Sequence, residues 1–296
     1  MTITIPRINQ TKTLGLALGG GGAAGFGHIG AISVLEEAGI KVDYLCGTSM
    51  GAIIGALYAI GMPSNEMMEF AQEAEKIKIS SLRNLNLTNV SLIDPEKIFQ
   101  IIEKAIGNRT FEDCKIPFGV VAIDIESGTE VLLDKGTMKY ALMASSAIPL
   151  VFPPVPFGEK ILVDGGLLNN VPITHLYKKR VERKVGIAIK NFTSRQHLSG
   201  AIFKHYFAGD YKVLKQAKMF KRLQENLNLL ADIALRSFEI ATSDSTEHRI
   251  QKANPDLVVR PEIEIELLSL DKASGAIKLG RKAMEDDFKK LESLLI

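Results

Sequence analysis

The stretch LGLALGGGGAAGFGHIG, residues Leu14–Gly30, decides the fold. Its first five residues, Leu14–Leu18, are apolar or glycine, which is typical of a short buried strand. A glycine loop follows, and from His28 to Ala38 apolar residues recur at helical spacing until Gly39, which is suited to a helix C-cap. The stretch therefore predicts a strand, a glycine loop and a helix in direct succession.

The same order recurs along the chain. Val42–Cys46 predicts a second strand, and Met50–Ile60 predicts the helix that follows it. Strands that alternate with helices indicate an α/β fold with a mostly parallel sheet. The other predicted elements are a helix that begins at Asp94-Pro95 and ends at Gly107, a β-hairpin of Phe118–Ile125 and Glu130–Leu133, strands at Lys160–Val163, Lys184–Ile189 and Asp256–Val259, and helical stretches at about 211–241 and at Asp271–Leu295.

Composition limits the class of protein. The 296 residues are 46% hydrophobic and 24% charged, which is enough for a large core and excludes a disordered or collagen-like chain. The two cysteines, Cys46 and Cys114, form no disulfide framework, and no metal or cofactor is expected. Without repeats or linkers, the chain predicts one domain over 1–296, with a basic helical insertion or lid candidate at about 195–230.

Three stretches lack Lys, Arg, Asp and Glu: Thr13–Leu35, Tyr44–Asn65 and Tyr140–Gly158. Each approaches the length of a membrane span, but glycines, polar residues or prolines interrupt all three, which favours strands and helices buried within a protein. Met1–Lys12 has no apolar segment after a basic start, so no secretory signal is predicted. We therefore expect a soluble cytoplasmic protein.

The most informative motif is Gly47-Thr48-Ser49-Met50-Gly51, which lies between the second predicted strand and its helix. In the G-x-S-x-G pattern, a sharp strand-to-helix turn exposes the serine, and the glycines avoid collisions across that turn. The turn also places the serine oxygen at a helix N-terminus, where developing negative charge is stabilised. Ser49 is thus a candidate nucleophile, with Gly47 and Gly51 as motif glycines.

The glycine loop allows three interpretations. A Walker P-loop is excluded because no Gly-Lys-Ser/Thr follows, and a dinucleotide fingerprint fits Gly20-x-Gly22-x-x-Gly25 only formally. The third interpretation is that consecutive N–H groups of Gly20, Gly21 and Gly22 form an oxyanion site beside Ser49. We favour it because loops after neighbouring parallel strands lie at the same sheet edge.

A third motif, Asp164-Gly165-Gly166, follows the predicted strand Lys160–Val163. Alone, Asp-Gly is a common turn, but a serine hydrolase needs a base near Ser49. The order serine, acid, histidine can be met by Ser49, Asp164 and one of four histidines, and the residues alone do not select among them. Those histidines are His175, His197, His205 and His248.

Four linked motifs together resemble the bacterial patatin-like phospholipases. They are LALGGGGAAGFGHIG at 16–30, GTSMG at 47–51, SSAIPLVFPPV at 145–155 and VDGGLLNNVP at 163–172. Their order and spacing match over about residues 14–190, with a weaker match through Asp256–Pro261 and the C-terminal helix. The resemblance implies a three-layer α/β/α fold with a mostly parallel central sheet, and hydrolysis of lipid acyl esters of the phospholipase A, lysophospholipase or esterase type.

By this resemblance, Ser49 is the nucleophile of a Ser–Asp dyad and Asp164 its base, so no histidine is required. Gly20, Gly21 and Gly22 form the oxyanion hole, and Gly25, Gly165 and Gly166 are motif glycines. One position departs from the family pattern, because Ala24 stands where a basic residue is usual. An alternative function is therefore a lipid- or membrane-binding regulatory protein on a degenerate hydrolase scaffold.

Charge is segregated along the chain although the net charge is only +2. Residues 178–222 hold 13 basic and 2 acidic residues, whereas the remainder holds 23 basic and 32 acidic ones. The segment fits either a core-packing helix with a solvated basic face or an interfacial helix on anionic lipid, and it lacks any nucleic-acid-binding module. The interfacial interpretation predicts peripheral membrane contact through Lys204, Lys212, Lys215, Lys218, Lys221 and Arg222.

Overall fold

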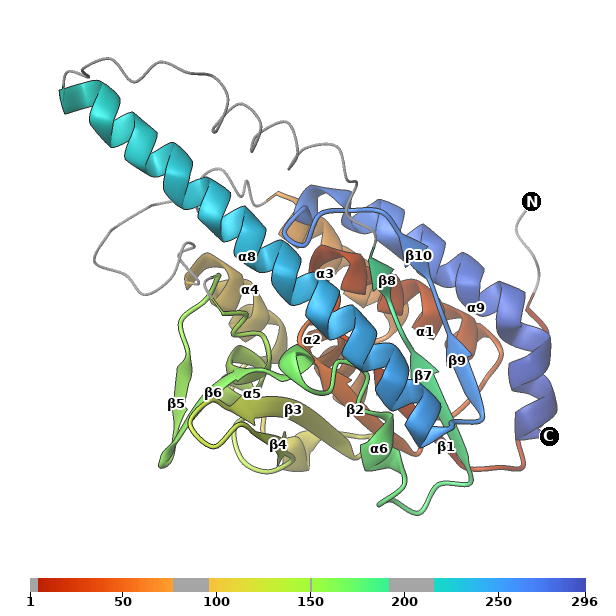
Figure 1. Cartoon of the computed structure of the whole chain (residues 1–296). Helices are drawn as coiled ribbons and strands as arrows, with labels where there is room; N and C mark the ends of the chain where they lie inside the picture. The colour runs from red at the N-terminus through yellow and green to blue at the C-terminus, as the bar shows by residue number, and fades with distance from the viewer. Residues whose placement is uncertain (1–4, 77–95, 150, 192–215) are drawn as a thin grey trace.

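The computed structural model describes residues 5–76, 96–149, 151–191 and 216–296 (Figure 1). A mixed sheet runs through its centre in the order β5-β6-β3-β2-β1-β7-β9, with β4 paired to β3, and a short β8–β10 pair lies beside it. The strands are β1 (Leu14–Leu18), β2 (Tyr44–Thr48), β3 (Phe118–Asp124), β4 (Thr129–Leu133), β5 (Val155–Phe157), β6 (Lys160–Asp164), β7 (Arg183–Ile187), β8 (Lys190–Asn191), β9 (Leu257–Val259) and β10 (Glu262–Ile263).

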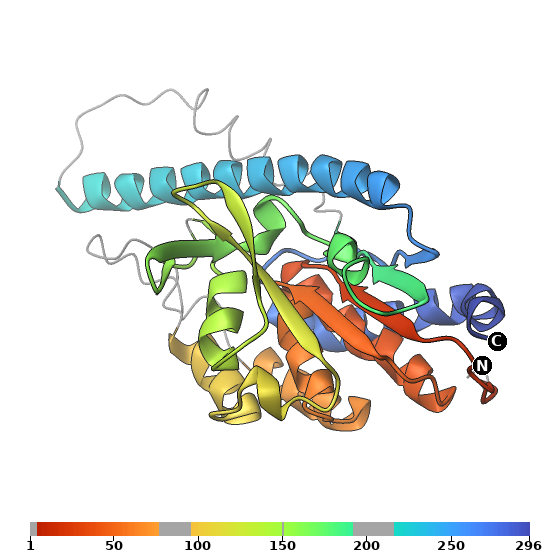
Figure 2. The same ribbon diagram turned by 90° about the horizontal axis from the view of Figure 1, so that it is seen from below.

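The helices connect these strands and cover the sheet. The longest, α8, crosses the sheet at one edge, and α1 and α9 pack together behind it (Figures 1 and 2). They are α1 (Gly27–Glu37), α2 (Met50–Ala59), α3 (Ser64–Glu75), α4 (Glu96–Ile106), α5 (Met138–Ser145), α6 (Ile173–Leu176), α8 (Gln216–Ala253) and α9 (Ala273–Leu295), with 3-10 turns η1 (Gly22–Phe26), η3 (Phe111–Asp113), η4 (Gly165–Leu167) and η5 (Leu270–Lys272).

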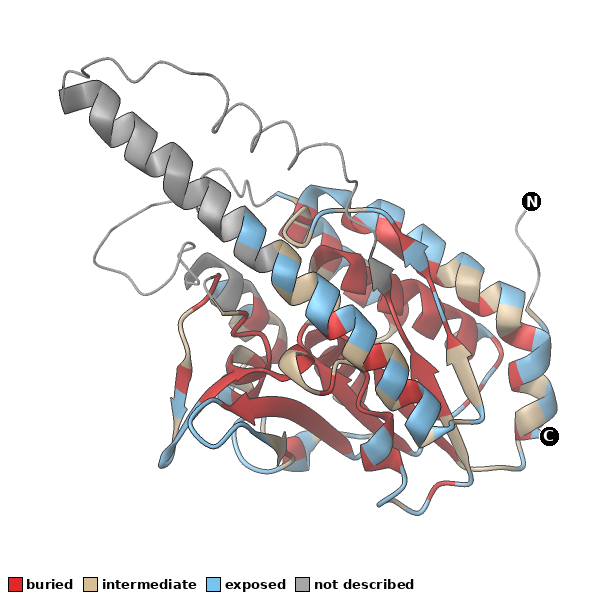
Figure 3. Ribbon diagram, viewed as in Figure 1, coloured by how far each residue is buried: buried red, intermediate tan, exposed pale blue. Residues whose placement is uncertain are grey.

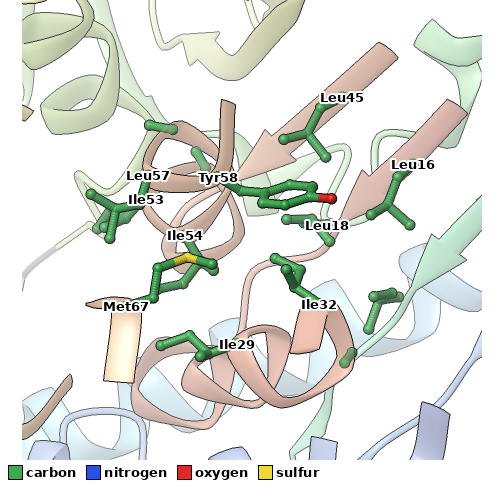
Figure 4. Close-up of a cluster of buried hydrophobic side chains, with 14 of the residues drawn as sticks. Leu16, Leu18, Ile29, Ile32, Leu45, Ile53, Ile54, Leu57, Tyr58 and Met67 are labelled. Atoms are coloured by element: carbon green, nitrogen blue, oxygen red, sulfur yellow. The ribbon is translucent and has the colours of Figure 1, made fainter. Parts of the chain in front are cut away.

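The sheet has apolar side chains on both faces, which makes the fold a three-layer α/β/α sandwich. Leu14, Leu16 and Leu18 of β1 point into the core formed with α1, α2 and α9, part of which is shown in Figure 4. Ala17 of β1 points to the opposite face, where it joins the apolar residues of α6 and Ile250 of α8. Figure 3 shows that the central strands are buried throughout.

The sheet has a parallel part and an antiparallel part, and their junction positions the site. β9, β7, β1, β2 and β3 are parallel, so the carboxyl ends of β1 and β2 lie at the same edge. β3 continues beyond β2, and β6 runs back along it with Asp164 opposite Ala122. On the other side of β3, Val121 lies opposite Thr48, the residue before Ser49. Because Val121 and Ala122 are adjacent, the antiparallel pairing of β6 places Asp164 near Ser49 across β3.

Most sequence predictions of elements are confirmed, with shifted boundaries. β1 has the predicted bounds, whereas the second strand begins and ends two residues later than Val42–Cys46. The helix predicted to end near residue 241 continues to Ala253. Helix α4 begins at Glu96, and Asp94-Pro95 lie outside the described residues. The sequence interpretation missed α3, α5, α6, β5 and the β8–β10 pair.

Helix α8 crosses the carboxyl edge of the sheet above the ends of β1 and β2 (Figure 2). Its C-terminal end is anchored to the body, because the Tyr177 hydroxyl donates to the carbonyls of Ala253 and Asn254 at 2.6 and 2.9 Å. Among the described residues, no helix is both long enough and apolar enough to span a membrane.

Candidate active site

Ser49 lies on a sharp turn between β2 and α2. Its backbone has φ 54° and ψ −126°, a left-handed conformation that is uncommon for a residue with a side chain. A Cβ atom on Gly47 would lie 2.6 Å from the carbonyl oxygen of Gly51, so the turn requires glycine there. Ser49 is the N-cap residue of α2 and is only 6% exposed, so the strained turn places it at the N-terminal end of that helix.

The turn is held by neighbouring hydroxyl groups. The Ser49 N–H donates to Ser145 Oγ at 2.8 Å, and Ser145 Oγ donates to the Val121 carbonyl at 2.6 Å. Thr48 Oγ1 donates to the Asn169 carbonyl at 3.0 Å. These bonds join the serine turn to α5, β3 and the loop after η4, so its strained geometry is fixed from three sides.

Asp164 ends β6 and is 2% exposed. Its Oδ1 accepts the Gly166 N–H at 2.7 Å, while its buried Oδ2 has no full hydrogen bond among the described residues. Burial raises the pKa of the Asp164 carboxyl to about 7, although the hydrogen bond from the Gly166 N–H and, to a smaller extent, the interaction with the Ser49 hydroxyl lower it. A carboxyl with a pKa near neutrality is suited to accept a proton in a reaction at neutral pH.

The glycine loop presents backbone N–H groups beside Ser49. Gly20 N–H donates to both the side-chain and the backbone oxygen of Asn170, each at 3.1 Å. The N–H groups of Gly21 and Gly22 have no hydrogen-bond partner among the described residues. Gly22 has φ +54°, and a Cβ there would collide with the Leu267 carbonyl, so the loop conformation requires glycine at this position.

Ala24 is fully buried in the apolar core next to the loop. Its N–H donates to the Gly21 carbonyl at 3.1 Å, and the preceding Ala23 N–H donates to the Leu267 carbonyl at 2.8 Å. Position 24, where the family pattern has a basic residue, therefore holds a packing residue whose N–H bond closes the glycine loop.

One cavity of about 100 Å³ contains these groups. Ser49, Asp164 and the glycine loop line it on the side of the sheet, and α8 contributes Phe238, Thr242 and Thr246. No Lys or Arg lines it among the residues that the structure describes. The three sequence-predicted groups thus meet in one small cavity beside α8.

The two buried histidines that the structure describes, His28 and His175, bond groups other than Asp164. Nε2 of His175 bonds a Glu130 oxygen, and the same carboxylate accepts Asn169 Nδ2 at 3.0 Å. Burial raises the pKa of Glu130, but the hydrogen bonds from His175 and Asn169 and the charges of His175 and Arg249 together outweigh it, and the net pKa is lowered. His248 is exposed, and His197 and His205 lie outside the described residues.

Three residues that sequence reasoning missed support the site through hydrogen bonds. Ser145, Asn170 and Glu130 hold the serine turn, the glycine loop and the loop after η4, respectively. Ser145 and Asn170 lie inside the motifs at 145–155 and 163–172. The motifs therefore indicated the segments near the site but not the hydrogen bonds that these two residues make. Of the proposed membrane-contacting residues, Lys204, Lys212 and Lys215 and the side chains of Lys218, Lys221 and Arg222 lie outside the described part.

Known proteins match over most of the chain. A family model described as patatin-like phospholipase matches residues 16–177. An uncharacterized NTE family protein of Mycobacterium tuberculosis is 27% identical over 277 residues, which cover 92% of this chain and 46% of that protein. The lysophospholipase NTE1 of Candida albicans is 28% identical over 290 residues, which cover 96% of this chain and 20% of NTE1. The chain therefore spans less than half the length of either relative.

A solved structure shares the fold. VipD from Legionella pneumophila superimposes with a TM-score of 0.55 at 12% sequence identity, over 99% of this chain and 71% of VipD. At that identity, the likeness concerns the architecture of the sheet and its helices.

Proposed function

The chain belongs to the patatin-like phospholipase family, and from this premise we propose that it hydrolyses lipid acyl esters with Ser49 as nucleophile and Asp164 as general base. The relative named as a lysophospholipase supports a lipid ester as substrate. The observation that carries the proposal is the meeting, in one cavity, of a strained serine, a buried carboxyl and backbone N–H groups that have no hydrogen-bond partner within the described part of the chain.

The first half of the reaction forms an acyl-enzyme. The Asp164 carboxylate accepts the hydroxyl proton of Ser49 while Oγ attacks the ester carbonyl carbon. The carbonyl oxygen becomes an oxyanion, which the N–H groups of Gly21 and Gly22 and the N-terminus of α2 stabilise. When the intermediate collapses, the alcohol leaves with the proton from Asp164. Water then attacks the acyl group by the same steps and releases the fatty acid.

In this mechanism Gly20 has a different role from its neighbours. The sequence prediction placed all three glycines in the oxyanion hole, and Gly20 N–H is engaged by Asn170. We assign donation to Gly21 and Gly22, and assign to Gly20 the anchoring of the loop. Each correctly placed donor contributes about 10²–10³-fold in rate, so two are sufficient for efficient catalysis even with Ala24 at the family's basic position.

The proposed activity is tested by incubating the protein with a lysophospholipid and with a short p-nitrophenyl ester. We expect saturable release of fatty acid and of p-nitrophenol. A protein that turns over neither ester but binds lipid vesicles would contradict the proposal, and would favour the regulatory alternative on a degenerate scaffold.

We further propose that residues 195–230 form a basic insertion that contacts anionic membranes. The expected result is co-sedimentation with vesicles containing phosphatidylglycerol that weakens as salt rises, because exposed charge pairs are screened within about 10 Å at 0.1 M salt. Replacing Lys204, Lys212, Lys215, Lys218, Lys221 and Arg222 together by glutamine should abolish this binding and leave hydrolysis of the short ester unchanged. Equal binding to neutral phosphatidylcholine vesicles would contradict it.

A further inference from the structure

A single peptide group, the one between Gly19 and Gly20, is held at both ends by side chains. His28 Nε2 lies 2.6 Å from its carbonyl oxygen, on Gly19. Asn170 Oδ1 lies 3.1 Å from its N–H, on Gly20. We propose that His28 and Asn170 are positioning residues that lock this peptide group and thereby keep the oxyanion hole formed. The inference rests on the proposed function, because the loop is assigned there as the oxyanion hole.

The chemistry of His28 suits a fixed donor. The residue is fully buried in α1, and burial lowers the pKa of its imidazole to about 4, so the ring is neutral near pH 7. A neutral imidazole carries one proton, and the Gly19 carbonyl can only accept, so the proton is assigned to Nε2. Nδ1 is buried and has no partner among the described residues, which agrees with an unprotonated nitrogen there.

Asn170 holds the opposite end of the same group. Its amide must turn Oδ1 toward Gly20, because the alternative orientation would place two N–H donors against each other. Its backbone carbonyl accepts the same Gly20 N–H at 3.1 Å, so the bond is shared between two oxygens. His28 comes from α1 and Asn170 from the loop after η4, so the two hydrogen bonds come from separate parts of the fold.

The loop needs such hydrogen bonds to fix its backbone, because glycine has little conformational preference of its own. If the Gly19–Gly20 peptide rotated, its carbonyl would turn toward Asn170, which lines the cavity, and the N–H groups of Gly21 and Gly22 would change direction. A carbonyl dipole in that place would repel the developing oxyanion. The far end of the loop is fixed separately by the bond from Ala23 N–H to Leu267.

Paired variants test the proposal in the full-length chain. His28→Leu and Asn170→Leu remove the donor or the acceptor at similar side-chain size, whereas His28→Gln and Asn170→Asp retain it. We expect each leucine variant to lower kcat for a p-nitrophenyl ester at least tenfold with KM within about threefold, and each conservative variant to recover most of this loss. Asn170→Asp should also move the acidic limb of the pH profile upward, because a second carboxylate raises the pKa of Asp164.

Amide hydrogen exchange separates this inference from the proposed function. The Gly20 N–H should exchange faster in both leucine variants and slowly in the wild type, whether or not the protein is an esterase. Unchanged exchange in the leucine variants, or faster exchange with an unchanged kcat, would overturn the inference. A wild type without esterase activity would contradict the proposed function alone. If His28→Leu does not fold, Asn170→Leu and Asn170→Asp, at a half-buried position, test the inference by the same measurements.

Discussion

Replacing Ser49 by alanine is expected to lower kcat for ester hydrolysis by about 10⁴-fold or more, with no loss of fold. Alanine removes only the attacking oxygen, because the hydrogen bond that holds the turn comes from the Ser49 backbone N–H to Ser145. The left-handed backbone at this position costs alanine about as much as serine. The thermal unfolding midpoint should therefore stay within a few degrees of the wild-type value.

A matched control for this variant is available at the tip of the β3–β4 hairpin. Ser127 is exposed there and donates to Asp124 at 2.7 Å, and it does not line the cavity that contains Ser49. Ser127→Ala should keep wild-type kcat and KM for the same ester. A Ser49→Ala protein that retains a tenth of wild-type activity would show that another residue is the nucleophile.

A second large loss of kcat is expected when Asp164 is replaced. Asparagine has nearly the same shape but cannot accept the Ser49 proton, so Asp164→Asn should lower kcat by about 10³-fold or more. In the wild type, the pKa of about 7 predicts that kcat/KM falls tenfold per pH unit on the acidic side of pH 7. A pH profile that is flat from pH 5 to 8 would contradict the assignment of Asp164 as base.

The same substitution should make the protein more stable at alkaline pH. Because the folded pKa of Asp164 lies above its unfolded value, the buried carboxylate destabilises the native state increasingly as pH rises from about 4 to 7. Replacing it by a neutral amide removes this penalty, which is at most about 4 kcal/mol at pH 8. The difference in unfolding midpoint between variant and wild type should be positive at pH 8 and vanish near pH 4.

Asp124 provides a control whose pKa is shifted in the opposite direction from that of Asp164. The hydrogen bond from Ser127, with those from Glu126 and Lys160, outweighs burial and lowers the pKa of Asp124. The ionised form is thus the stabilising one, and that stability is lost as pH falls through the folded pKa. Asp124→Asn should therefore lower the unfolding midpoint at pH 8. Equal shifts at both positions would show that the Asp164 effect is not electrostatic.

Local sequence predicted the elements that carry the proposed catalytic groups. The strand, turn and helix around Ser49 are determined by residues close to it in the sequence. The apolar run before the turn forms the strand, and the glycines at 47 and 51 permit the sharp turn. The glycine loop after β1 is equally local. For these segments the predicted strands and helices are confirmed, with boundary shifts of up to two residues.

The long-range contacts were beyond local sequence. Asp164 reaches the site because β6 returns antiparallel to β3, a pairing that depends on residues far apart in the chain. The wall formed by Thr242 and Thr246 depends on α8 continuing past residue 241, where serines, threonines and charged residues obscure a helical pattern. The roles of His28 and Asn170 depend on which atoms of the glycine loop each one meets, which spacing alone does not encode.

The most direct test of the account is the mass of the protein after reaction with a fluorophosphonate, read by peptide mass spectrometry. The reagent phosphonylates a serine that is activated as a nucleophile and lies beside oxyanion donors. The account predicts one adduct per chain, located on Ser49, at a rate that falls as pH drops below about 7 and that Asp164→Asn lowers sharply. An intact protein that stays unlabelled, or an adduct at any other serine, would contradict it.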